Sequence, residues 1–376
     1  MKTCLKAFAL PVLVFLMFSC TVNNEVIEPE FSFSINKNQK YVDCSQNFEG
    51  KFYECPEDEI ATVNGEKTSL SAFGVYNPLI NEMVWKFPEV TRVRESRTNI
   101  DGDYEDYEKE YILPYFGVFN EKNEEIEWRV ARLQQANEDT RVGDRGIIKR
   151  RIHVVLPYFG IYNYLNNVKE VEWKLAEVEN VRDTTRTDNI YYKTDKNYVL
   201  PYFGVFMMYD QDYAEIEWKR ADLEARTETI RKGLSYTHID RHYVLPYFGL
   251  VSDFNGVAIL DWEQAELKPA SEYTRVNNIY TQVQRYYVLP YYGVLVRNGD
   301  SGWTDWKQAE LEVTEVSMTK GSSQYTIHTH SLKEFSGKSE GDGTIQWQKT
   351  EKQIALDTGI PGLNRDIFKL DVLLDL

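Results

Sequence analysis

Val244-Leu-Pro-Tyr-Phe-Gly249 occurs three times without change in this chain, and the other two copies end at Gly160 and Gly204. Near copies end at Gly117 and Gly293, and a more divergent one ends at Gly74. A tryptophan in an acidic, apolar-alternating stretch follows each copy. The matching tryptophans are Trp85, Trp128, Trp173, Trp218, Trp262, Trp306 and Trp347, at intervals of 41 to 45 residues. Seven units of about 44 residues therefore dominate the chain, which is a repeat protein.

The tryptophan segments are predicted to be strands. In residues 215–224, the apolar positions Ile216, Trp218, Ala221 and Leu223 would scatter around a helix instead of forming a stripe. On a strand, Ile216 and Trp218 share one face, and one extra residue near Arg220 brings Ala221 and Leu223 back to it, as in a β-bulge. We expect three or four short strands in each unit.

The segment at 243–251 is apolar or aromatic on both alternating faces, so it must be covered on both sides. Small antiparallel sheets that each pack between two neighbours are typical of a β-propeller. The fold class expected is therefore all-β, with seven units in a propeller, and an open array of three-stranded β-meander repeats is the alternative. Ring closure would use residues 368–376 or 31–53. Proline cannot donate to a ladder, so the repeated prolines belong on edge strands or at bulges. These prolines are Pro114, Pro157, Pro201, Pro246 and Pro290.

The N-terminus indicates export. Lys2 and Lys6 precede an apolar run at 7–18 that is too short to span a bilayer. Leu16-Met-Phe-Ser-Cys20 resembles the lipobox of bacterial lipoproteins, although Met17 and Phe18 depart from the usual pattern. The resemblance covers only the first 20 residues. It implies removal of a signal peptide, 1–19, and a diacylated Cys20 that anchors the chain in a bacterial cell envelope, at the periplasmic face or the cell surface. A plain cleaved signal is the alternative.

Beyond the signal, residues 20–59 are predicted to be a lipid-anchored linker, 60–352 the repeat domain and 353–376 a closing strand. Cys4 leaves with the signal, so Cys44 and Cys55 are the pair available in an oxidising compartment, and we expect a disulfide between them.

The chain is acidic, with a net charge of −16 that becomes −18 when Lys2 and Lys6 leave with the signal. This charge makes nucleic acid a poor partner. It also disfavours adsorption to anionic lipid, so the lipid on Cys20 is expected to be the membrane contact.

The repeated aromatic residues have two interpretations. Residues kept in successive units respond to packing between units, and we expect the repeated tryptophans to be core residues. The tyrosine of Leu-Pro-Tyr has a hydroxyl that needs a polar partner, so it is a candidate for a repeated ligand-binding site. These tyrosines are Tyr115, Tyr158, Tyr202, Tyr247 and Tyr291. Variable loops between the glycine and tryptophan strands should share one rim, and Trp303, the tryptophan outside the repeat register, is a candidate binding platform there.

Signals for catalysis, cofactors or metals are weak. His328 and His330 alternate onto one strand face but lack an identifiable third ligand, and the acidic loop 101–106 lacks calcium-loop spacing. We therefore assign no catalytic residue, metal or cofactor. The function expected is a lipid-anchored, non-enzymatic envelope binding or adhesion protein for a polysaccharide or a protein partner. The alternatives are a hydrolase or lyase with acidic residues at a propeller axis, and a structural component of an envelope complex.

Overall fold

The computed structural model describes residues 46–48, 51–53, 56–165, 168–187, 190–208, 214–254, 257–276, 279–298, 301–320, 323–340 and 343–350. All of them belong to one compact unit, Asp43–Leu356; a second unit, Met1–Val42 with Asp357–Leu376, lies outside the described residues. The described part consists of strands joined by short turns and contains no helix, which confirms the all-β prediction. Within it, no helix has the length and apolar character needed to cross a membrane.

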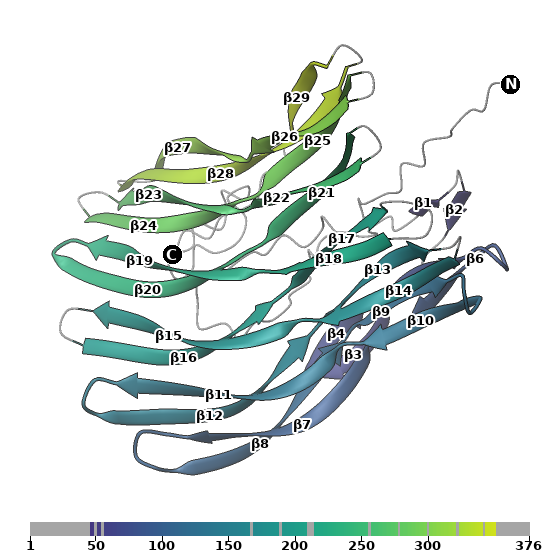
Figure 1. The fold of residues 1–376 in the computed structure, drawn as a ribbon. Coiled ribbons are helices and arrows are strands. Elements are labelled where there is room, and N and C mark those ends of the chain that lie inside the picture. The colour runs from purple at the N-terminus through teal and green to yellow at the C-terminus, as the bar shows by residue number, and fades with distance from the viewer. Residues whose placement is uncertain are drawn as a thin grey trace, which may run out of the picture. The chain divides into compact units, whose positions relative to one another are not determined.

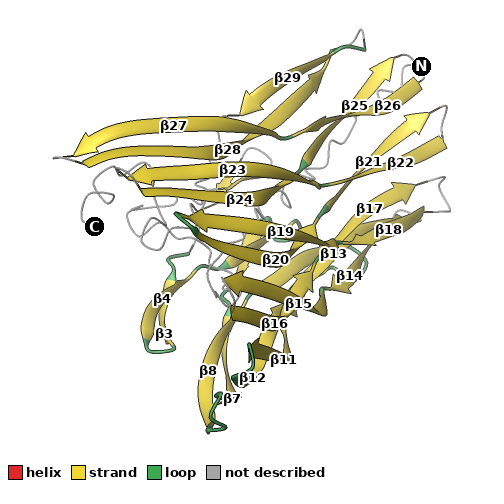
Figure 2. Ribbon diagram, turned by 90° about the vertical axis from the view of Figure 1, so that its left-hand side faces the viewer, coloured by secondary structure: helices red, strands yellow, loops and turns green. Residues whose placement is uncertain are grey.

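Six long hairpins lie side by side in one antiparallel sheet (Figures 1 and 2). They are β7 (Glu89–Thr98) with β8 (Tyr104–Leu113), β11 (Arg132–Val142) with β12 (Gly146–Leu156), β15 (Glu177–Thr187) with β16 (Ile190–Leu200), β19 (Asp222–Lys232) with β20 (Ser235–Leu245), β23 (Glu266–Val276) with β24 (Ile279–Leu289), and β27 (Glu310–Lys320) with β28 (Ser323–Ser339). The first strand of each hairpin pairs with the second strand of the next. This pairing is short: β15 meets β20 only from Thr184 opposite Asp240 to Thr187 opposite Thr237. Neighbouring hairpins therefore pair near their turns and then leave the ladder.

Seven short hairpins alternate with the long ones along the chain. They are β5 (Phe73–Asn77) with β6 (Glu82–Lys86), β9 (Tyr115–Asn120) with β10 (Glu125–Val130), β13 (Tyr158–Leu165) with β14 (Val168–Leu175), β17 (Tyr202–Met208) with β18 (Ala214–Arg220), β21 (Tyr247–Phe254) with β22 (Val257–Gln264), β25 (Tyr291–Asn298) with β26 (Ser301–Gln308), and the end of β28 with β29 (Ile345–Thr350). Two further hairpins precede them, β1 (Gln46–Phe48) with β2 (Lys51–Tyr53) and β3 (Glu59–Val63) with β4 (Glu66–Leu70).

The chain passes between long and short hairpins at the repeated proline and at an alanine. Pro201 separates β16 from β17, Ala221 separates β18 from β19, and the Ala221 amide donates to the Pro201 carbonyl at 2.9 Å. The same bond recurs at Ala131, Ala176, Ala265 and Ala309. Proline suits this position because only its carbonyl is used. The apolar alternation shifts by one residue near Arg220 because the chain there leaves its pairing with β17 and begins to pair with β20.

The most buried side chains lie at these junctions. The leucine before each proline and the alanine after each tryptophan strand are almost fully buried, as with Leu200 and Ala221, both 0% exposed. Their equivalents are Leu113, Leu156, Leu245, Leu289, Ala131, Ala176, Ala265 and Ala309. The core is therefore a line that runs from repeat to repeat between the two kinds of hairpin.

In every short hairpin a glycine faces the repeated tryptophan across the ladder. A Cβ on Gly160 would lie 2.7 Å from the ring of Trp173, and a Cβ on Gly204 would lie 2.5 Å from Ile161 of the preceding repeat. The other facing pairs are Gly74–Trp85, Gly117–Trp128, Gly249–Trp262, Gly293–Trp306 and Gly337–Trp347. The glycine thus admits its own indole and, in most repeats, an aliphatic side chain from the preceding hairpin in the stack. Each inner short hairpin packs against the hairpins before and after it, so both of its faces are covered.

The order of strands in the sheet begins at β27 and ends at β8, with β29 added to β28. In the described part of the chain these strands form a repeat array with two ends and no closed ring. Residues 368–376 lie outside the described part, and β1 and β2 from 31–53 pair with each other. The propeller is unconfirmed, and the antiparallel array is the architecture observed.

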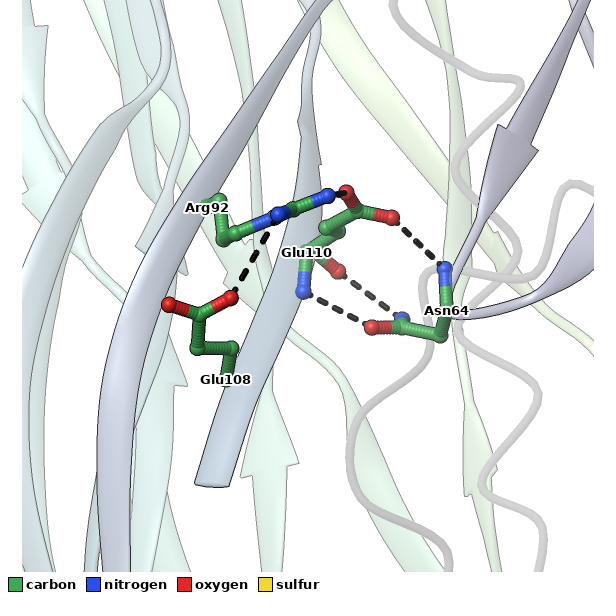
Figure 3. A network of polar contacts seen from close by, with 4 residues as sticks. All are labelled: Asn64, Arg92, Glu108 and Glu110. Atoms are coloured by element: carbon green, nitrogen blue, oxygen red, sulfur yellow. Dashed lines mark hydrogen bonds and ion pairs between the residues drawn. The ribbon is translucent and has the colours of Figure 1, made fainter. Parts of the chain in front are cut away.

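The edge strand β8 is covered by a side chain from another hairpin (Figure 3). Asn64 lies in the β3–β4 turn with a φ of 50°, and its Nδ2 donates to the Glu110 carbonyl at 2.9 Å while its Oδ1 accepts from the Glu110 amide at 2.7 Å. The amide group replaces a neighbouring strand at this point. Glu110 also binds Arg92 at 2.6 Å, and this hydrogen bond lowers the pKa of the Glu110 carboxyl. An exposed edge is a template for strand addition, so this contact protects the end of the array.

Asn64→Gly removes the amide and keeps the freedom for a positive φ. We expect hydrogen exchange at the Glu110 amide to become about fivefold faster, because bonds worth about 1 kcal/mol are lost, and self-association to rise in analytical ultracentrifugation. Asn81→Gly, at a second positive-φ turn with a φ of 57°, is the matched control. Equal behaviour of the two variants would contradict the edge-protection role.

Gly160→Ala tests the glycine–tryptophan contact. The new methyl group overlaps the Trp173 ring, and we expect the free energy of unfolding in urea to fall by roughly 1 to 3 kcal/mol. In a Trp173→Ala background the same change should cost much less, because the overlapping ring is gone. An undiminished cost there would show that the glycine serves another purpose.

Candidate binding surface

The candidate tyrosines of Leu-Pro-Tyr lie half-buried at the start of the short hairpins. The rings of Tyr115, Tyr158, Tyr202 and Tyr247 meet the tryptophan of the same hairpin edge-on. Tyr247 meets Trp262 with ring centroids 6.4 Å apart and planes at 88°. Its hydroxyl donates to Asp222 at 2.6 Å, and that of Tyr291 donates to Glu266 at 2.8 Å. Tyr115 and Tyr202 bind Glu89 and Glu177 in the same way. The structure therefore supplies the polar partner that each of these hydroxyls needs.

Tyr158 differs from the other candidates. The position that carries the carboxylate in the other repeats, the first residue of the long hairpin's first strand, is Arg132 in β11. The ring of Tyr158 still meets Trp173 edge-on, with centroids 6.4 Å apart. The ring packing is thus common to the repeats, whereas the carboxylate is not.

Three successive repeats add a nitrogen donor to the tyrosine and the carboxylate. Arg220, Gln264 and Gln308 are cross-strand neighbours of the tyrosines and donate to the paired carboxylates, at 2.7, 3.0 and 2.8 Å. The Tyr202 hydroxyl, then Arg220, lowers the pKa of Glu177. Hydrogen bonding to Asp222 and burial raise the pKa of Tyr247 to about 12. Each trio brings together an aromatic ring, a carboxylate and a nitrogen donor near the surface, groups that suit a polyhydroxylated ligand.

The repeated tryptophans join neighbouring repeats. The indole Nε1 of Trp218 donates to Glu172 at 2.7 Å, that of Trp262 to Glu217 at 2.9 Å, and that of Trp306 to Asp261 at 2.8 Å. Each acceptor is the residue just before the tryptophan of the preceding repeat. This geometry agrees with a packing role, and the recurring acidic residue before tryptophan was the sequence signal for it, which our sequence reasoning did not use.

A buried carboxylate lies at each of four points where neighbouring long hairpins diverge, which we call forks. The fork carboxylates are Glu95, Asp183, Glu228 and Glu272, all at most 5% exposed. Glu272 accepts from the Tyr287 hydroxyl at 2.5 Å and from the His330 amide of the next hairpin at 3.2 Å. Glu95 likewise accepts from Tyr111 and from the next hairpin's His153 amide. Glu95 and Glu272 thus each accept a backbone amide that the ladder leaves unpaired, while Asp183 and Glu228 accept from the hydroxyls of Tyr198 and Tyr243.

The fork between β11 and β16 is built differently. The tyrosine position there is Val154, and the side-chain amides of Asn180 and Asn197 both donate to the Asn137 carbonyl, at 3.2 and 2.9 Å. A different set of polar side chains thus closes the same gap. Sequence reasoning missed the forks, because acidic residues at these positions look like ordinary solvated strand residues.

Trp303 lies in β26, paired with Val296 near the outer end of the short hairpin, and is 43% exposed. Val296 is 0% exposed, so the indole lies beside a fully buried residue while much of its surface faces solvent. Among the described tryptophans, Trp303 alone is exposed, and the seven repeated tryptophans are half-buried.

The histidine pair is packed inside the sheet. His328 stacks on Tyr273 with centroids 4.6 Å apart, and burial lowers the pKa of His330. Within the described ranges, no group of three or more His, Cys, Asp or Glu is arranged to hold a metal. In the acidic loop, Asp103 binds Asn99. Cys20, Cys44 and Cys55 lie outside the described residues, so lipidation and the disulfide stay predictions.

Comparison with known proteins gives no relative from which to infer function. No family model, curated protein or solved structure matches the chain. The candidate surface is therefore argued from its own residues.

Tyr243→Phe tests the forks. It leaves the buried Glu228 without its hydroxyl donor, and we expect the free energy of unfolding to fall by roughly 1 to 3 kcal/mol. Tyr247→Phe removes a similar bond to the exposed Asp222 and should cost less than about 1 kcal/mol, because water replaces the donor. An equal loss of unfolding free energy in the two variants, measured by urea unfolding, would show that burial at the fork does not strengthen the contribution of this hydrogen bond to stability.

Proposed function

We propose that the protein is a lipid-anchored, non-enzymatic binding or adhesion protein of a bacterial cell envelope, and that it binds a polysaccharide through the outer ends of its short hairpins. The observation that carries this is the exposure of Trp303 at such an end. An indole provides a large, rigid, amphipathic contact, which is the kind of residue that dominates binding energy. The lipid anchor rests on the lipobox-like sequence that ends at Cys20.

The repeat architecture supports an extended ligand. Each repeat adds two strands to the sheet, so equivalent positions in successive repeats lie about 10 Å apart. The trios of Tyr202, Tyr247 and Tyr291 lie at the junction ends of these short hairpins and recur once per repeat in three consecutive repeats. A chain of sugars also repeats at regular intervals, and it offers hydroxyl groups that both donate to carboxylates and accept from amides.

The hydrolase or lyase alternative requires acidic residues that converge. The buried carboxylates of the described chain are instead distributed one to a fork, and each accepts from a tyrosine of its own hairpin. A protein partner or an envelope scaffold is compatible with the same outer ends, and the experiment below separates these from a glycan.

The test is affinity electrophoresis of the chain from Thr21 onward through gels that contain different polysaccharides. We expect one glycan to retard the protein and Trp303→Ala to weaken that binding about thirtyfold, the effect of losing roughly 2 kcal/mol. Ile60→Ala is the control, because Ile60 is 74% exposed but lies in β3, which precedes the seven short hairpins. A sample that is folded by circular dichroism and is retarded by no glycan would contradict the proposal and favour a protein partner.

A further inference from the structure

The turns of the second to fifth long hairpins form a rim whose composition differs from the rest of the chain, including the acidic turn of the first long hairpin. We define the tip rim as residues 140–148, 185–187, 190–193, 229–237, 274–276 and 279–281, the turn ends of the second to fifth long hairpins. These ends are joined side by side: the Gly143 amide donates to the Tyr191 carbonyl at 2.7 Å, and the Gly233 amide to the Tyr280 carbonyl at 3.2 Å. The β15–β20 ladder joins the third long hairpin to the fourth in the same way.

Large apolar side chains concentrate on this rim and face solvent. Leu234 is 96% exposed and Ile279 is 62% exposed. Large apolar side chains that are exposed at adjacent turns form a patch, and such patches mark interaction sites. The other exposed apolar residues of the rim are Ile190, Tyr191, Tyr192, Tyr236 and Tyr280. The rim therefore presents a row of aliphatic and aromatic groups, with neighbouring members supplied by successive hairpins.

The rim is basic although the chain is acidic. Its seven basic residues, all exposed, are Arg141, Arg145, Arg186, Lys193, Arg231, Lys232 and Arg275, against the single described acidic residue Asp144. Arg186 lies over the ring of Tyr191, its cross-strand neighbour, at 5.1 Å from the centroid, and Arg231 lies over Tyr236 at 5.5 Å. Arginine, tyrosine and protruding aliphatic groups thus occur together in each of these hairpins.

We infer that the tip rim docks on an anionic lipid surface. Aliphatic side chains enter the boundary of head groups and acyl chains, tyrosines lie at the level of the head groups, and arginines bind anionic lipid. A soluble polyanion would use the arginines but would leave Leu234 and Ile279 in water. The net charge of the chain, −16, does not describe this rim, because nearly all the negative charges lie elsewhere.

This inference adds a second membrane contact and does not depend on the glycan surface. Each repeat runs from the tip rim through the proline junction to the outer end of the short hairpin, so the two surfaces lie at opposite ends of the repeat (Figure 1). A protein held by the rim would present Trp303 away from the lipid. Replacing Trp303 therefore leaves lipid binding unchanged on this inference.

The experiment measures sedimentation of the chain from Thr21 onward with vesicles of equal parts phosphatidylcholine and phosphatidylglycerol. This chain lacks Cys20 and the signal, and it contains the whole of the unit Asp43–Leu356, to which every described contact belongs. We expect it to bind these vesicles and to bind pure phosphatidylcholine vesicles far more weakly. A folded chain that stays in the supernatant with both would overturn the inference.

Two sets of substitutions separate the contributions of charge and apolar contact. Replacing Arg186, Arg231 and Arg275 with glutamine should weaken binding on the order of a hundredfold, about fivefold for each charge. Leu234→Ser with Ile279→Ser should weaken it about tenfold, because apolar surface no longer enters the interface.

Matched controls remove the same number of positive charges and of large apolar side chains at exposed positions outside the rim. For charge they are Lys67, Lys122 and Lys338 to glutamine, and for apolar contact Leu79→Ser with Ile80→Ser. Equal losses in the controls would overturn the rim assignment. Binding that survives the Leu234 and Ile279 changes, and that soluble polygalacturonate competes away, would instead assign the rim to a polyanion and overturn docking on lipid.

Discussion

The contact on which the structure depends is the indole that lies over a glycine in each short hairpin. A side chain at Gly160 would occupy the place of the Trp173 ring, so the two residues specify one another. With the ring fixed, its Nε1 points toward the preceding repeat, where the carboxylate of Glu127 accepts it. One pair of residues therefore determines both the packing inside a hairpin and the bond between hairpins. This explains why glycine and tryptophan persist in repeats whose turns differ in length and chemistry.

The distance between stacked short hairpins matches the width that each long hairpin adds to the sheet, so successive repeats can be added without strain between the two parts. Short hairpins stack face to face, which places them about 10 Å apart, and each long hairpin adds two strands about 4.8 Å apart to the sheet. The ribbon must turn between the stacked part and the paired part, and the turn opens the forks. Amide groups that leave the ladder there would be unpaired in a buried place, which is costly. At the first fork the Glu95 carboxylate accepts such an amide, that of His153, and it also accepts from the Tyr111 hydroxyl.

The alternation of apolar residues along the sequence predicted the strands and the faces that are covered. The apolar positions around Trp218 required strands, and the two-sided apolar segment at 243–251 required cover on both faces; both are found. The division of each repeat between a stack and a sheet was not predicted, because Pro201 and Ala221 mark it only when they are seen bonded to one another. For the candidate site, sequence singled out Trp303 and the tyrosines, but the paired carboxylates lie about 25 residues earlier in the chain, as Asp222 does from Tyr247. Closure into a ring depends on small rotations between repeats, which no residue pattern encodes.

The acidic composition follows from the way the repeats are joined. Three positions in a repeat use a carboxylate to accept a neutral donor: one binds the indole of the next repeat, one binds the tyrosine hydroxyl at the junction, and one closes the fork. Glu172, Glu177 and Asp183 fill these positions within a dozen residues of one another. Each of these three positions needs a hydrogen-bond acceptor, and a carboxylate provides one. The chain is therefore acidic for a structural reason that is independent of any ligand. Net charge is then a poor guide to binding, and the informative region is the tip rim, where backbone bonds join the hairpins and exposed basic and apolar residues accumulate.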